Sequence, residues 1–270
     1  MSNTEPDAAP MDGGSGTSSS ELWRSPVATL PLWPVALSGG ILLFSFVALE
    51  PALLAGSRWR GLDLLVFDVL ALWWWWRSSR RRGHSVRDVL GPAPTLRQLA
   101  LMLVATLVAQ ALRVGWLAWI ASRDLVPEYW KAAIERSSSQ TGLTPAELLA
   151  FVVAGPFLEE ILFRGLVFRR SLRRMRPILA ALGSSLLFGL CHFDILGSLS
   201  FALILVGLYV RSNSLWVPIA AHALFNATAS LMGALVEARA SLGWAIAGAQ
   251  LVCVPWLVWF VHRSLRQLRG

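Results

Sequence analysis

Charged residues are scarce in this chain of 270 residues, at 15% of the total, while hydrophobic residues make up 55%. A soluble domain carries about 25% charged residues, so the composition excludes an ordinary water-soluble globule. Disorder over most of the chain is also excluded, because disordered chains are poor in hydrophobic residues. The composition therefore indicates an integral membrane protein.

Cysteine is almost absent too. The two cysteines, Cys191 and Cys253, both lie inside apolar runs, which excludes a disulfide-stapled scaffold. Residues 1–22 are polar and rich in glycine and serine, and we expect them to form a disordered tail. No basic stretch precedes a short apolar core there, so we expect no cleaved signal peptide, and the first helix would act as an uncleaved anchor.

Apolar segments follow the tail, and we expect each of them to form a helix of one bundle. They are continuous rather than alternating, which excludes membrane-spanning strands. The eight segments are 33–55, 62–76, 99–121, 146–168, 178–196, 199–211, 215–236 and 243–262. The sequence thus predicts an all-α, polytopic membrane protein with about eight transmembrane helices in one domain over residues 23–270.

The net charge of +8 comes from arginines that gather in short loops between the apolar segments. Two clusters, at 77–87 and 169–176, are typical of cytoplasmic loops and do not form the continuous stripe of a nucleic-acid binder. We therefore expect the lipid bilayer, and no nucleic acid, as a partner. With eight spans, both termini lie in the cytoplasm, and we expect a bacterial inner membrane. The tryptophans at 73–76 precede the first cluster and are predicted to anchor a helix in the headgroup layer.

Ionisable side chains inside apolar segments are costly and usually pair or do chemistry. Asp68 and Arg113 lie at similar expected depths on consecutive helices, and we expect them to form a structural ion pair. Glu50, beside Pro51, is expected at the membrane surface. The other such residues, except Asp194, fall into three motifs.

The three motifs each place polar or aromatic residues four positions apart, on one helix face. They are Glu159-Glu160-Ile161-Leu162-Phe163-Arg164, Phe188-Gly189-Leu190-Cys191-His192 and His222-Ala223-Leu224-Phe225-Asn226. This spacing lets Glu160 reach Arg164, while Glu159 points to another side of the helix. From their expected depths, Glu159, His192, His222 and Asn226 are predicted to converge near the middle of the membrane.

Such a group of side chains can hydrolyse an amide bond. A carboxylate beside an imidazole can take a proton from an attacking water, and a second imidazole and an amide can donate to the oxyanion that forms. A serine nucleophile, Ser184 or Ser185 with His192, is an alternative. A zinc site of Glu159, His192 and His222 is another. No HExxH motif is present, and we favour a site without metal or other cofactor.

Together, in this order and spacing, the motifs EExxxR, FxxxH and HxxxN resemble those of the CPBP family of intramembrane proteases, which includes the type II CAAX prenyl endopeptidases. The run from Gly207 to His222 also resembles the approach to that family's last motif. The resemblance covers about residues 145–230.

The resemblance implies roles for the motif residues. Glu159 would activate the water with His192 as its partner, and His222 and Asn226 would form the oxyanion site. Glu160 and Arg164 would orient the first motif, and Phe188 would shape the pocket. Members of the family are described both as glutamic proteases and as metalloproteases, so zinc stays an alternative.

The resemblance also implies a membrane-embedded or lipidated peptide or protein as substrate. In a bacterium, prenylated substrates are not expected, and maturation of a secreted peptide or another anchored protein is more plausible. A non-catalytic bacteriocin-immunity or scaffold protein with the same fold, and a transporter or channel, are the alternatives that we weigh against a protease. Six polar motif residues are retained at a cost to membrane insertion, which favours catalysis.

Overall fold

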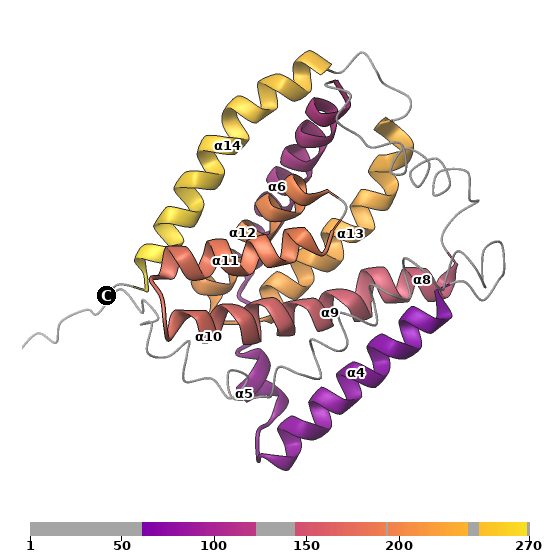
Figure 1. The fold of residues 1–270 in the computed structure, drawn as a ribbon, viewed down its shortest axis with the longest axis vertical. Coiled ribbons are helices and arrows are strands. Elements are labelled where there is room, and N and C mark those ends of the chain that lie inside the picture. Colours follow the sequence, from indigo (N-terminus) through magenta and orange to yellow (C-terminus); the bar gives the residue numbers. More distant parts are fainter. Residues whose placement is uncertain (1–60, 123–143, 193, 237–242, 269–270) are drawn as a thin grey trace, which may run out of the picture.

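The computed structural model describes residues 61–122, 144–192, 194–236 and 243–268. In these ranges the regular secondary structure is entirely helical, with no strand, as the sequence predicts. The polar tail at 1–22 and the first expected helix at 33–55 lie outside the described residues. Each of the other seven apolar segments coincides with helix over most of its length (Figure 1).

Helix α4 (Leu62–Arg81) carries the tryptophans in its C-terminal half. The guanidinium of Arg77 lies 5.6 Å from the ring of Trp73, so the aromatic and basic groups adjoin at this end of the helix. The short helix α5 (Val86–Leu90) follows and begins with a capping box, in which Ser85 and Asp88 exchange hydrogen bonds. Hydrogen bonds that the Asp88 carboxyl accepts from Ser85, first from its side chain and then from its backbone N–H, lower the pKa of this carboxyl.

The segment that carries the first motif is one unbroken helical rod (Figure 1). It consists of α8 (Pro145–Leu149), η3 (Ala150–Ala154), α9 (Gly155–Glu160), η4 (Ile161–Phe168) and α10 (Arg169–Leu172), and both η segments are π-helical. Thr144 and Glu147 form a capping box at its start, and proline occupies the first helical position. π-helical turns occur often at functional sites. Here they flank the two adjacent glutamates.

Helix α12 (Ile195–Ser212) lies at the centre of the bundle. It packs against α6 (Leu96–Ser122), α11 (Pro177–Leu190), α13 (Trp216–Val236) and α14 (Gly243–Arg266). Its side chains are buried on nearly every face of its central turns, from Ser200 to Val210. A helix that is apolar all round belongs in such a core.

Helix α11 is shorter than the predicted segment 178–196, because it ends at Leu190. The backbone N–H groups of Cys191 and His192 bond to the carbonyls three residues back, which tightens the last turn. The Asp194 side chain then caps α12, accepting a hydrogen bond from the Gly197 N–H at 2.9 Å. Residue 192 therefore follows the helix instead of lying within it.

The surface of the bundle is that of a membrane protein. Large apolar side chains are exposed along α6 and α14, for example Leu107 at 71% and Leu251 at 78%, which is unusual on a soluble monomer. By length and composition, two described helices can cross a membrane, over Leu96–Trp116 and Ile195–Ser212. Helix α11, with 14 residues, is about 21 Å long, shorter than the hydrocarbon layer of about 30 Å. The expected count of eight spans is not confirmed.

Candidate functional site

The site is assembled where the rod, the end of α11 and helix α13 meet. Glu159 and Glu160 are the last residues of α9, His192 follows α11, and His222 lies in α13. These four side chains belong to three separate stretches of chain, one for each of the three motifs. The packing of α9 and η3 against α13, and of α11 against η4, brings these stretches together.

Glu160 forms a buried ion pair with Arg164, one turn away on the same rod. Oε1 of Glu160 accepts a hydrogen bond from Nη1 of Arg164 at 2.8 Å, and the two side chains are only 0% and 1% exposed. Nη2 of Arg164 donates to the Ala202 carbonyl at 3.1 Å, which ties the rod to α12. The pairing agrees with the spacing in the sequence.

Glu160 also contacts His222, which the sequence did not predict. Nδ1 of His222 lies 2.9 Å from Oε1 of Glu160. Because the carboxylate can only accept here, Nδ1 carries the proton. The contact orients the imidazole so that Nε2 faces away from Glu160, 3.8 Å from Oε2 of Glu159.

His192 approaches Glu159 from the turn that follows α11. Its Nδ1 lies 2.7 Å from the carbonyl oxygen of Phe188, which can only accept, so Nδ1 is protonated here too. Its ring stacks on the Phe188 ring at 4.3 Å. Nε2 is thereby directed to Oε2 of Glu159, at 3.7 Å.

Glu159 is therefore the point at which the two imidazoles converge. Its Oε2 has no hydrogen-bond donor within reach among the described residues, and both distances are too long for a direct bond. Separations of this size between polar groups suit a bridging water or a reacting oxygen. The side chains of Glu159 and His192 are 29% and 31% exposed, against 3% for His222, whereas Oε2 of Glu159 is itself buried.

Asn226 lies one turn along α13 from His222. Its Nδ2 donates to the Phe151 carbonyl in η3 at 2.7 Å. The structure thus places the amide against the rod. The aromatic walls are Phe188, whose ring lies 4.7 Å from the Arg164 guanidinium, and Phe201, edge-on to His222 at 5.2 Å.

The expected ion pair between Asp68 and Arg113 is wrong. Arg113 lies 3.7 Å from Asp194 instead, because α6 packs against α12 whereas α4 packs against the rod. Asp68 is 2% exposed and close enough to Glu159 for the two charges to interact. Its position inside an apolar segment was the available signal, but the sequence could not tell which helix it would face. Phe201 carried no signal at all, since it belongs to a uniformly apolar run.

The serine nucleophile and the zinc site were the two alternative chemistries. Neither Ser184, which donates to the Ala181 carbonyl, nor Ser185 has a hydrogen bond to His192 among the described residues. For zinc, no group of three or more His, Cys, Asp or Glu side chains in the described ranges is placed to hold a metal ion. The donor types of Glu159, His192 and His222 would nonetheless suit one.

Comparison with known proteins gives three findings. Residues 141–228 match the family model described as "Type II CAAX prenyl endopeptidase Rce1-like". The chain is 31% identical over 115 residues to "Putative membrane peptidase YdiL" of Bacillus subtilis (strain 168), a stretch that covers 39% of this chain and 47% of that relative. The chain thus matches about half the length of this curated relative. No solved structure matches significantly.

The matched family segment contains all of the motif residues, from Glu159 to Asn226. It also coincides with the rod and with helices α11 to α13, which build the site. Residues 141–228 of this helical membrane protein are therefore similar to the type II CAAX prenyl endopeptidases, and this similarity agrees with the resemblance carried by the three motifs.

Proposed function

We propose that this protein is an intramembrane endopeptidase that cleaves a peptide bond with a water activated by Glu159. The observation that carries the proposal is the convergence of the His192 and His222 Nε2 atoms on one carboxylate oxygen, at 3.7 and 3.8 Å. The family match and the membrane peptidase similar to this chain support the reaction class.

In the proposed reaction, Glu159 takes a proton as the water oxygen attacks the carbonyl carbon of the peptide. His192, oriented by the Phe188 carbonyl, holds the water beside the carboxylate. His222, held by Glu160 through Nδ1, stabilises the oxyanion in this scheme by donating from Nε2, which requires a proton on both ring nitrogens. Asn226 is the second donor in this scheme. The C–N bond then breaks, and the proton held by Glu159 passes to the leaving amine.

The proposed substrate is a membrane-anchored or lipid-modified peptide or protein. The exposed large side chains of α6 and α14 indicate that the bundle is surrounded by lipid. A substrate that is itself held in the bilayer is concentrated next to such a site. The partial exposure of Glu159 and His192 provides the side from which its scissile bond would enter.

The general-base role predicts that Glu159→Gln abolishes turnover while the fold is kept, because the shape is retained and the basicity is lost. A general base contributes about 100-fold or more to the rate, so we expect at least that loss. The full-length protein is reconstituted in liposomes with quenched fluorogenic peptides carrying a lipid anchor, and cleavage is followed by fluorescence and mass spectrometry.

Asp88→Asn is the matched control, because it makes the same carboxylate-to-amide change in the exposed capping box of α5. It should cleave at the wild-type rate. Equal rates for the wild type and Glu159→Gln would contradict the assignment of the base. An inactive wild type that is properly folded would favour the scaffold or immunity alternative.

A zinc-dependent protease with the same residues is the second candidate. It is favoured by one observation, namely that both Nδ1 atoms are engaged by carbonyl or carboxylate oxygens while both Nε2 atoms face Glu159. Metal-binding histidines are typically held in this way. A bound zinc ion would polarise the peptide carbonyl and the attacking water.

Metal depletion separates the two candidates. We expect the activity of the reconstituted protein to survive exhaustive dialysis against a strong chelator, and the protein to contain less than stoichiometric zinc by elemental analysis. Loss of activity on dialysis, with recovery when zinc is added back, would replace the glutamic mechanism by the metal-dependent one.

A further inference from the structure

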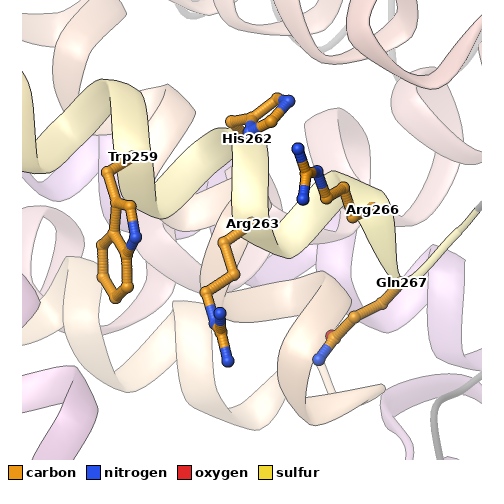
Figure 2. Close-up of a pocket in the computed structure, with 5 residues that line it drawn as sticks. All are labelled: Trp259, His262, Arg263, Arg266 and Gln267. Carbon is orange, nitrogen blue, oxygen red and sulfur yellow. The ribbon is translucent and has the colours of Figure 1, made fainter.

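An open pocket lies at the C-terminal end of α14, on a helix that the proposed reaction does not use. It has a volume of about 450 Å³ and is lined by Trp259, His262, Arg263, Arg266 and Gln267. Figure 2 shows that all five side chains project from α14, with Trp259, Arg263 and Gln267 on one side of the helix in this view and His262 and Arg266 on the other. Their spacing of four residues places these three on one helix face.

The pocket is rich in positive charge. Arg263 and Arg266 are exposed, and no acidic side chain among the described residues pairs with either. Two further arginines come from other helices, since Arg211 on α12 lies within electrostatic range of both Arg263 and Arg97 on α6. Three helix ends thus bring basic side chains to one end of the bundle, and such a concentration of charge attracts an anion.

The position of the pocket along α14 identifies the kind of anion. In the turns before it the helix exposes apolar side chains, with Leu251 78%, Val252 71% and Val258 64% exposed. Trp259, which is 54% exposed, follows, and the Arg263 guanidinium lies 5.9 Å from its ring. A change from exposed aliphatic groups to tryptophan and then to arginine marks the level of the lipid headgroups.

We propose that this pocket binds the headgroup of an anionic phospholipid. Arg263 would bind the phosphate through charge-assisted hydrogen bonds, and the Gln267 amide on the same face would donate an additional one. Arg266 would add its charge from the adjoining side of the helix. The Trp259 ring would lie against the glycerol and the upper acyl chain, an environment that suits an indole. The proposal concerns binding alone and does not depend on the protease assignment.

The test compares phosphatidylglycerol with phosphatidylcholine, using the full-length protein in a zwitterionic detergent. Lipid retention is measured by native mass spectrometry, and the midpoint of thermal unfolding is followed as each lipid is titrated. For the wild type we expect phosphatidylglycerol to be retained preferentially and to raise the midpoint. In the double variant Arg263→Gln/Arg266→Gln, the apparent affinity should fall about 30-fold, as expected for the loss of two basic residues at a membrane surface.

The matched control removes two exposed arginines at the end of another helix, as Arg80→Gln/Arg81→Gln in α4. It should bind phosphatidylglycerol as the wild type does. The variant Arg263→Lys/Arg266→Lys keeps the charge and should retain most of the binding, which guards against a folding defect in the glutamine variant. An equal loss in the α4 control would show non-specific attraction and overturn the proposal. Equal binding of both lipids, or stabilisation by inorganic phosphate alone to the same extent, would overturn it as well.

Discussion

At the scale of single residues, the buried Glu160–Arg164 pair is the contact on which the site geometry depends. Oε1 of Glu160 accepts from both Arg164 and His222, and Arg164 reaches across to α12. A buried ion pair adds little net stability, but removal of one partner leaves an uncompensated charge. The pair therefore acts chiefly to orient His222.

The ion pair predicts a large loss of stability in Arg164→Ala. The Glu160 carboxylate, 0% exposed, would lose its cationic partner, and such a loss costs about 3–5 kcal/mol. The measurement is the free energy of unfolding in detergent, from denaturant titration followed by tryptophan fluorescence.

Arg174→Ala is the control for this prediction. Arg174 is exposed, just after the end of the rod, and its removal should change the free energy of unfolding by less than about 0.5 kcal/mol. If the two alanine variants unfold at the same denaturant concentration, the buried ion pair does not stabilise the fold.

At the scale of elements, the contact between α12 and α14 depends on the absence of a side chain at Gly207. A Cβ atom there would lie 2.4 Å from Cε1 of Phe260. That ring is 1% exposed and stacked on Trp256 at 4.8 Å, so it has little room to move. The glycine allows the two helices to pack closely.

We therefore expect Gly207→Ala to destabilise the bundle. Overpacking of a filled core costs about 1–3 kcal/mol, and the midpoint of thermal unfolding should fall accordingly. Gly183→Ala on α11 is the matched control, because a Cβ there would meet nothing within 4 Å. Because alanine is more stable than glycine inside a helix, this variant should be more stable by about 0.5–1 kcal/mol. If both variants shift the midpoint of thermal unfolding in the same direction, close packing at Gly207 is contradicted.

Element ends illustrate how far the sequence could predict the fold. The long apolar runs predicted seven helical segments in the described ranges. The reason is that a continuous apolar run in a membrane can pair its backbone N–H and C=O groups only as a helix. The end of α11 at Leu190 was not predictable, because Cys191 and His192 continue the apolar and motif pattern. A tight turn and the Asp194 cap terminate the helix there instead.

At the scale of the whole molecule, the described helices form one bundle in which α12 is enclosed and the outer helices expose apolar side chains. The membrane class thus agrees with the low content of charged residues. The number of spans does not follow from the apolar segments alone, because a helix as short as α11 can be apolar without being long enough to cross the bilayer.

By itself, the sequence determined the helical membrane class, the three motif segments and the Glu160–Arg164 pair, since these depend on composition and on neighbours within one helix. Only the tertiary structure decided that Arg113 pairs with Asp194, that Glu160 holds His222 and that both Nε2 atoms face Glu159. The physical reason is that contacts between helices depend on how each helix is rotated and tilted in the bundle. Long, evenly apolar helices such as α12 carry almost no periodic signal of that rotation.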